Sequence, residues 1–162
     1  MAKFQANVIL NSYRPNRTFR VSDSLTPGVS ASWLDKVDAG KLVKMIGDSQ
    51  YGLCAVGDQI EGYLATANDV APNDGFALGS VQAQDRFKVT LDGLQATPGT
   101  GTVVIGDYVV TGTVTARGSV LPGPVKVCKA TAAANTLLFR WRVVSLLSGN
   151  GAVGSIAVVE FV

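Results

Sequence analysis

Short apolar runs, each bounded by glycine, aspartate, asparagine or proline, recur along most of this chain. From Lys41 to the end they follow one another roughly every 8–15 residues. β-Prone runs at this spacing, separated by turn residues, are typical of an all-β fold. The runs span residues 42–46, 51–55, 60–65, 75–82, 87–91, 103–105, 108–115, 125–129, 139–147 and 155–162.

The runs differ in their density of strand-forming residues. Tyr108–Thr115 and Arg140–Leu147 are the richest in Val, Thr and Leu, which predicts that they are central strands. Within the second run, strand alternation places Trp141 on the core face and its two arginine neighbours on the other. Tight turns with a positive-φ glycine are predicted at the three Gly-Asp pairs, and exposed loops at the Pro/Gly-rich tracts. The pairs are 47–48, 57–58 and 106–107, and the tracts are 95–102 and 121–124.

These patterns predict one body, residues 41–162, built as a single β-sandwich or barrel-like domain with less than about 15% helix. Residues 1–40 are different, because their apolar positions are few and are interrupted by Pro15 and Pro27. Only residues 30–37 have the pattern of a helix of one or two turns, starting from a serine cap.

We therefore expect residues 1–40 to form an extended N-terminal arm. Such a segment cannot offset an ordering entropy of about 1–2 kcal/mol per residue unless it buries its apolar side chains elsewhere. A neighbouring subunit or another protein surface is the favoured place, and an edge strand through Lys3–Leu10 on its own body is the alternative. The candidate partner-docking residues are the aromatic and basic side chains of the arm: Phe4, Tyr13, Arg14, Arg17, Phe19, Arg20 and Trp33.

Composition narrows the classes of partner. Charged residues make up 16% of the chain against about 25% in ordinary globular proteins, and hydrophobic residues make up 47%. This balance excludes disorder for the chain as a whole and leaves apolar surface for a partner. A net charge of +2 does not predict nucleic acid as a partner. The three arginines of the arm are weak evidence for such a partner, because they are not part of a folded basic face. The basic stretches 1–20 and 101–162 flank an acidic stretch, 48–92; this favours contact between copies, with ordinary surface scatter as the alternative.

The sequence carries little catalytic chemistry. Histidine is absent, which removes Ser–His and Cys–His nucleophile pairs. Cys54 and Cys128 lack zinc-site spacing and are predicted to be buried free thiols, with a disulfide as the alternative. Residues 149–154 match G-x-G-x-x-G but lead into a strand instead of a helix, so a hairpin loop is predicted there. We expect no enzyme activity, no cofactor, no metal and no membrane partner, and synthesis in the cytoplasm.

Six turn-and-strand segments stand out along the chain: residues 40–44, 55–63, 79–82, 105–110, 141–146 and 156–160. They resemble segments of the decoration, or cement, proteins of tailed-bacteriophage capsids. They cover about three-quarters of the chain, in a similar order. The resemblance implies a β-rich body that binds assembled major capsid protein on the virion exterior and stabilises the shell. It also implies a symmetric homo-oligomer, with a trimer favoured over a dimer, and no catalytic residue. The alternative is a phage tail or baseplate β-domain that binds a receptor or glycan.

Overall fold

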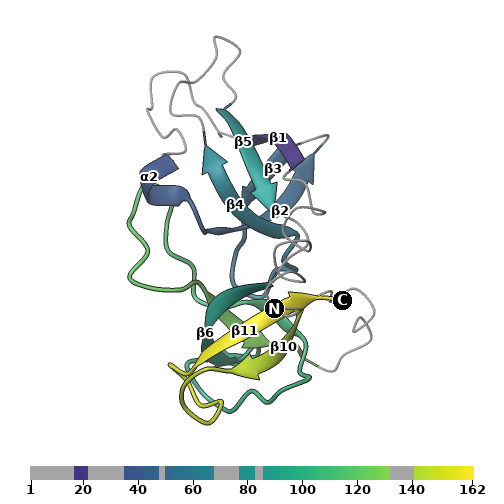
Figure 1. Ribbon diagram of the computed structural model, residues 1–162, viewed down its shortest axis with the longest axis vertical. Helices are drawn as coiled ribbons and strands as arrows, with labels where there is room; N and C mark the ends of the chain where they lie inside the picture. Colours follow the sequence, from purple (N-terminus) through teal and green to yellow (C-terminus); the bar gives the residue numbers. More distant parts are fainter. Residues whose placement is uncertain (1–16, 22–34, 48–49, 68–76, 83–85, 132–140) are drawn as a thin grey trace, which may run out of the picture.

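The computed structural model describes residues 17–21, 35–47, 50–67, 77–82, 86–131 and 141–162. The described chain is all-β and forms two sheets, with one short helix of four residues, α2 (Asp35–Asp38). The all-β fold predicted from the spacing of the apolar runs is confirmed, and two sheets are the arrangement of a β-sandwich. The two sheets lie one above the other along the long axis (Figure 1).

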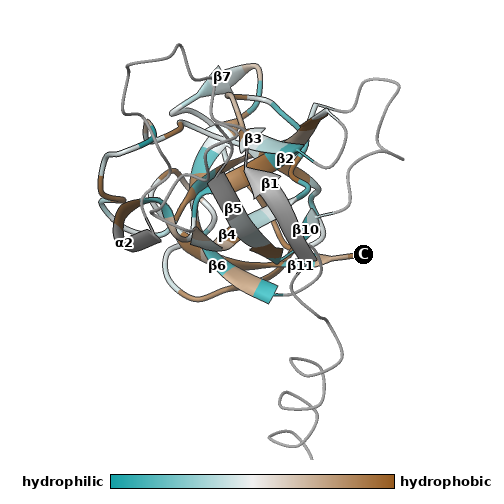
Figure 2. Cartoon of the chain, turned by 90° about the horizontal axis from the view of Figure 1, so that it is seen from above, coloured by the Kyte–Doolittle hydropathy of each residue, from teal (hydrophilic) through white to brown (hydrophobic). Residues whose placement is uncertain are grey.

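The upper sheet is a closed five-stranded barrel in the order β1-β3-β2-β4-β5. It closes where β5 pairs antiparallel with β1, and β1 also runs parallel to β3. Figure 2 views the molecule from above, along the direction that is vertical in Figure 1. The strands are β1 (Arg17–Val21), β2 (Leu42–Gly47), β3 (Gln50–Leu53), β4 (Gly62–Ala67) and β5 (Ala77–Gln82).

The lower sheet follows the order β10-β11-β6-β9-β8, and the two-residue strand β7 (Thr97–Pro98) pairs with β6. An antiparallel bridge between Tyr108 and Arg142 brings its first and last strands together, so this sheet also curls around its core. Its main strands are β6 (Arg86–Leu94), β8 (Val109–Thr111), β9 (Lys126–Lys129), β10 (Trp141–Leu146) and β11 (Ile156–Phe161).

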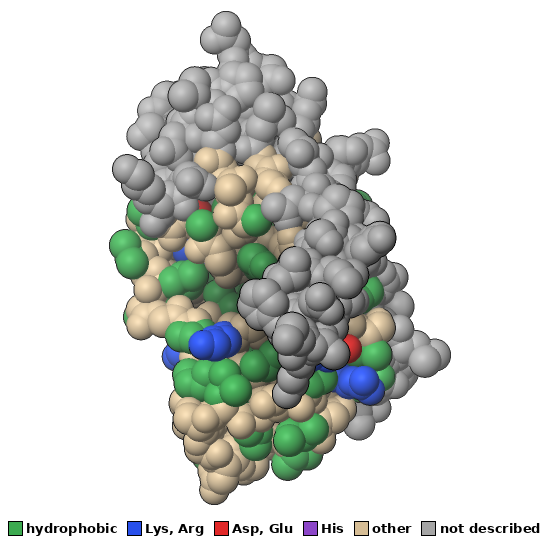
Figure 3. Space-filling view, in the orientation of Figure 1, with side chains coloured by type: hydrophobic (Ala, Val, Ile, Leu, Met, Phe, Trp, Pro, Cys, Tyr) green, Lys and Arg blue, Asp and Glu red, His purple; other side chains and the backbone are tan. Residues whose placement is uncertain are grey.

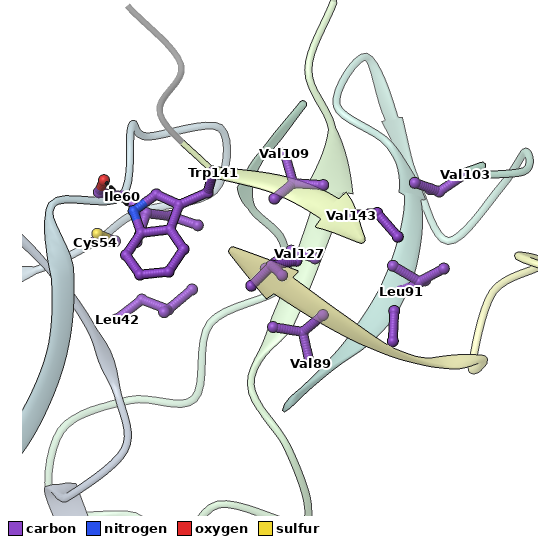
Figure 4. Close-up of a cluster of buried hydrophobic side chains, with 12 residues drawn as sticks. Leu42, Cys54, Ile60, Val89, Leu91, Val103, Val109, Val127, Trp141 and Val143 are labelled. Carbon is purple, nitrogen blue, oxygen red and sulfur yellow. Dashed lines mark hydrogen bonds between the residues drawn. The ribbon is translucent and has the colours of Figure 1, made fainter. Parts of the chain in front are cut away.

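The largest core belongs to the lower sheet but receives side chains from the upper one. Trp141 is fully buried there, and its indole Nε1 donates a hydrogen bond of 3.0 Å to the Ile60 carbonyl. Figure 4 shows this indole beside Leu42, Cys54 and Ile60, with the valines of the lower sheet beyond it. The prediction that Trp141 faces the core is confirmed.

The barrel has a smaller core of its own, made of Val43, Tyr51, Leu64, Ala67 and Val81. Strand β2 contributes to both cores, because successive side chains of a strand point to opposite faces. Its Leu42 packs into the shared lower core, and the next residue, Val43, packs into the barrel. One strand thus ties the two sheets together.

Some strand predictions are wrong in detail. The two runs expected to be central, now β8 and β10, lie at the two ends of the lower sheet, and β6 is central instead. Strand β8 also ends at Thr111 rather than Thr115, because the Asp92 carboxylate accepts hydrogen bonds from the amide and hydroxyl of Thr113 and holds the chain away from the sheet. The run 103–105 is not a strand, although Val103 is buried.

The first forty residues are described only in part. Five of them, Arg17–Val21, form β1 and hydrogen-bond to this chain's own β3 and β5. These five residues complete the barrel of their own chain. In this they differ from the prediction of an arm that is held mainly on another molecule. The helix predicted at residues 30–37 overlaps α2 at residues 35–37, and its serine cap and the proposed edge strand Lys3–Leu10 lie outside the described residues. The boundary at residue 40 stays a prediction.

Candidate functional site: four strand-bound turns

Six described turns close around a positive-φ glycine at their third position, and four of them are also fixed by two backbone hydrogen bonds to one facing strand residue, whereas turns 97–100 and 116–119 are not. The four are as follows. In each, the amide of the fourth residue donates to the carbonyl of the first, over 3.0–3.2 Å. The third residue is always a glycine with φ between 82° and 94°, a left-handed conformation that other residues adopt at a cost. We call them the strand-bound turns: residues 38–41 (D-A-G-K), 55–58 (A-V-G-D), 104–107 (V-I-G-D) and 152–155 (A-V-G-S).

Each turn is fixed to a single residue of a facing strand by two hydrogen bonds. The glycine amide donates to the carbonyl of that strand residue over 2.7–2.8 Å. The amide of the same strand residue donates back to the carbonyl of the fourth turn residue over 2.8–3.0 Å. The strand residues, in the order of the turns, are Leu64, Thr111, Val143 and Leu91.

Aspartate side chains stabilise two of these turns further, through a hydrogen bond and an ion pair each. Asp58 accepts a hydrogen bond of 2.6 Å from the Ala55 amide and pairs with Lys44 Nζ at 2.6 Å. Asp107 accepts a hydrogen bond of 2.8 Å from the amide of Val104, the first residue of its turn, and pairs with Lys129 Nζ at 2.9 Å. The predicted role of Gly-Asp as a tight turn is confirmed at these two pairs. At the third pair, Gly47 lies within β2 and is not among the positive-φ glycines, and Asp48 lies outside the described residues.

The second residue of a strand-bound turn forms its tip. Three of the four tips are large aliphatic side chains that remain exposed: Val56 at 51%, Ile105 at 60% and Val153 at 43%. The fourth tip is the half-buried Ala39. None of the backbone hydrogen bonds that define the turn needs an aliphatic side chain at this position. We refer to Val56, Ile105 and Val153 as the aliphatic tips.

Two of the aliphatic tips, Ile105 and Val153, are carried by turns whose preceding segments are hydrogen-bonded to each other. An antiparallel bridge joins Thr102 to Ala152, and the Val103 amide donates to the Gly151 carbonyl over 2.9 Å. The turns that carry Ile105 and Val153 therefore start side by side on the lower sheet. Figure 3 shows hydrophobic side chains reaching the surface over this lower part of the molecule, with few charged ones among them.

A buried ion pair supports the first strand-bound turn. Lys41 and Asp38 are 1% and 0% exposed, and Lys41 Nζ lies 2.5 Å from Asp38 Oδ1. The same ammonium donates to the carbonyls of Ala116 and Ser119, and Asp38 Oδ1 also accepts from the Gly118 amide. Both charges are therefore compensated, as buried charges must be. The pair links the end of the barrel to the loop after β8.

The residues predicted to dock a partner are mostly beyond the described chain. Arg17, Phe19 and Arg20 lie on β1, whereas Phe4, Tyr13, Arg14 and Trp33 lie outside the described residues. Their docking role stays a prediction. Sequence reasoning missed the aliphatic tips, and the pattern of an aliphatic residue followed by Gly and then Asp or Ser does not single them out, because it also occurs within strands β2 and β5.

The two cysteines behave as predicted from their spacing. Both are buried free thiols. Burial raises the pKa of the Cys54 thiol to about 12. Burial, together with the neighbouring Asp92 carboxylate, raises the pKa of Cys128 to about 11. Thiols in this state are poor nucleophiles, since the thiolate is the reactive form.

Within the described ranges, no three His, Cys, Asp or Glu side chains gather as a metal ion would require. Among the same residues, no helix is long and apolar enough to span a bilayer. The chain matches no family model, no curated protein and no solved structure.

Proposed function

We propose that this chain is a non-enzymatic structural protein of a tailed-phage virion, which binds the outer surface of the assembled capsid and stabilises the shell. Its partner would be the major capsid protein, and its copies would associate with one another, as trimers rather than dimers. The proposal is supported by the resemblance of its turn-and-strand segments to decoration proteins. The structural observation that carries it is the set of aliphatic tips on rigid turns.

Exposed aliphatic side chains at three equivalent positions need an explanation beyond folding. The side chain of a tip residue takes no part in the hydrogen bonds of its turn. The fourth strand-bound turn forms with the small Ala39 at the same position. Burying a Val or Ile side chain against a partner is worth about 1.5–3 kcal/mol. Because each tip is held by backbone hydrogen bonds, little conformational entropy is lost when it becomes buried. Contact with another protein surface is the use that fits these properties.

The stabilising mechanism would be mass action. A ligand that binds the assembled lattice but not its dissociated subunits stabilises the lattice by RT ln(1 + [L]/Kd) for each site. Repetition over a symmetric shell multiplies this effect, and association of the chain into oligomers adds avidity. No catalytic group is needed for such a role.

The test is sedimentation of phage heads with the purified protein. The triple variant Val56→Ser/Ile105→Ser/Val153→Ser should keep its fold and bind heads at least tenfold more weakly, since completing the burial of three half-exposed aliphatic side chains is together worth more than about 1.4 kcal/mol, which is a tenfold change in affinity. Val120→Ser is the matched control, because Val120 is 74% exposed but lies outside the strand-bound turns. Equal binding by wild type and the triple variant would contradict the role of the tips.

The arm is tested separately by deleting residues 2–16, which leaves β1 and the barrel intact. We expect a folded protein with weakened binding to heads, because Phe4, Tyr13 and Arg14 are removed. Electron microscopy of labelled particles addresses the location. Label on the tail or baseplate instead of the head would refute the capsid assignment and favour a receptor-binding or glycan-binding domain.

A further inference from the structure

The loop between β10 and β11 carries a pair of residues with a chemistry of its own. Asn150 is followed directly by Gly151, and it is the only one of the seven asparagines of the chain with glycine after it. The loop lies at the lower end of the molecule, where Asn150 is exposed to solvent (Figure 1). A side-chain carboxamide can react with the backbone nitrogen that follows it, and a glycine at that place has no Cβ to hinder the approach.

The fold requires glycine at position 151. Gly151 is buried and has a φ of 87°, and a Cβ added there would lie 2.0 Å from the Val103 carbonyl oxygen. The carbonyl of Gly151 accepts a hydrogen bond of 2.9 Å from the Val103 amide. Its amide, in contrast, donates no hydrogen bond to any residue of the described chain. The nitrogen is therefore unengaged, while packing keeps the residue a glycine.

The side chain of Asn150 is folded back toward this nitrogen. Its Oδ1 accepts a hydrogen bond of 3.4 Å from the Ala152 amide, two residues further along the chain. A bond of this kind forms an Asx turn, which brings Cγ of the side chain close to the amide nitrogen of Gly151. The Ala152 amide is also the donor that would stabilise negative charge on Oδ1 during attack on Cγ. The loop thus brings together an electrophile, a nucleophile and an oxyanion donor.

We propose that Asn150 is a site of spontaneous deamidation and isomerisation. The Gly151 nitrogen loses its proton to hydroxide and forms a bond to Cγ of Asn150. The bond between Cγ and Nδ2 then breaks, and Nδ2 takes a proton from water and leaves as ammonia. Water next adds to one of the two carbonyl carbons of the resulting succinimide. Cleavage between Cγ and the nitrogen gives aspartate, and cleavage between the backbone carbonyl carbon and the nitrogen gives isoaspartate.

Either product changes the junction between this loop and the loop that it contacts. Segments 93–106 and 143–159, on the two sides of the junction, contain no charged residue, so the product carboxylate introduces a charge among them. Isoaspartate also lengthens the main chain by one atom, so the hydrogen bond between Val103 and Gly151 cannot keep its geometry. The modification therefore both charges and loosens the junction between the turns that carry two of the aliphatic tips.

The test is peptide-resolved mass spectrometry of the full-length protein, incubated in the folded state at 37 °C and digested at mildly acidic pH. We expect the peptide with residue 150 to gain the mass difference between a carboxamide and a carboxylic acid and to separate into aspartate and isoaspartate forms. Its conversion should exceed that of any of the six other asparagines. The rate should rise with pH, since the attacking nitrogen must lose a proton. An Asn150 that stays intact in the folded protein would overturn the proposal.

Two comparisons assign the roles within the loop. Asn150→Gln keeps a carboxamide, but its cyclisation needs a six-membered ring, so this variant should stay unconverted at position 150. The same protein unfolded in urea lacks the Asx turn. A rate in the folded state that equals or exceeds the rate in urea would support the Ala152 amide as oxyanion donor. A slower rate in the folded state would refute that contribution.

Hydrogen exchange at the Val103 amide measures the structural consequence. Asn150→Asp carries the new charge on an unaltered main chain and is the matched control, so it should keep the Val103 amide protected. The isoaspartate form, separated by ion-exchange chromatography, should lose this protection, because its lengthened chain displaces the Gly151 carbonyl. Equal protection in the two forms would refute loosening of the junction.

Discussion

The barrel and the lower sheet reach stability by different means. The lower sheet buries a twelve-residue cluster, in which Trp141 makes edge-on contacts with Phe87 and Phe161 at ring-centre distances of 4.7 and 5.6 Å. Among the residues whose burial the structure describes, five form the barrel's own core. The barrel compensates with closure, which leaves no free sheet edge, and with the buried Lys41–Asp38 pair at its end.

The difference shows where the molecule is cooperative. Leu42, Cys54 and Ile60 belong to the barrel half of the sequence but pack into the core of the lower sheet. Loss of the lower core should therefore weaken the barrel too, whereas loss of the barrel core should have a more local effect. This asymmetry can be tested by paired substitutions.

The largest effect is expected for Trp141→Ala. The change removes the aromatic contacts and the hydrogen bond to Ile60, and should lower the free energy of unfolding by about 3–5 kcal/mol. Leu64→Ala in the barrel core should cost near the lower end of about 2–5 kcal/mol. Urea unfolding gives both values, and amide hydrogen exchange should show lost protection in both sheets for Trp141→Ala only. A larger cost at Leu64 would reverse the comparison.

The next largest loss of unfolding free energy is expected for Lys41→Met. It removes the ammonium that pairs with the buried Asp38 carboxylate, and breaking a buried ion pair in this way typically costs about 3–5 kcal/mol. The control is Lys44→Met, whose partner Asp58 and own side chain are both partly solvated, so about 0–1 kcal/mol is expected. Thermal unfolding of the two variants measures the contrast. Similar costs would mean that the buried pair does not hold the barrel to the loop after β8.

Replacing the turn glycine by alanine should lower the free energy of unfolding by a similar amount in the barrel half and in the lower sheet. Gly40→Ala in the barrel half and Gly106→Ala in the lower sheet each force alanine into a left-handed conformation, at about 1–2 kcal/mol. The added methyl group meets no close neighbour at Gly106 and an ordinary contact at 3.4 Å at Gly40. Gly123→Ala is the control, since Gly123 has open space and no positive φ. Denaturant unfolding that gave different costs at the two turns would show that they are not equivalent.

The smallest effect concerns the thiols. Because folding raises both pKa values from 9.0, to about 12 for Cys54 and about 11 for Cys128, the folded state holds these protons more tightly than the unfolded state. Their contribution to stability is complete below about pH 9 and is lost as the pH rises toward 11–12, by at most about 1.4 kcal/mol per pH unit for each thiol. Cys54→Ala should flatten the fall in unfolding free energy between pH 9 and 10.5. An unchanged slope would contradict this.

Local pattern was enough for part of this structure. The turns at Gly57 and Gly106, the hairpin loop at residues 149–154 and the burial of Trp141 all follow from short stretches of sequence, because glycine conformation and strand alternation are local properties. The aliphatic tips do not follow from the turn sequence alone, because the same pattern occurs within strands β2 and β5. The docking residues of the arm remain predictions, since most of them lie outside the described chain.

Other features depend on contacts between distant segments. The sequence by itself determined an all-β chain, the positions of most strands and the conformation of the turn glycines Gly57 and Gly106. Only the tertiary structure decided that β1 closes a barrel, that β8 and β10 are terminal strands joined by a bridge, and that Lys41 is buried. Strand order and burial are set by which distant surfaces pack together, and no local residue pattern encodes that choice.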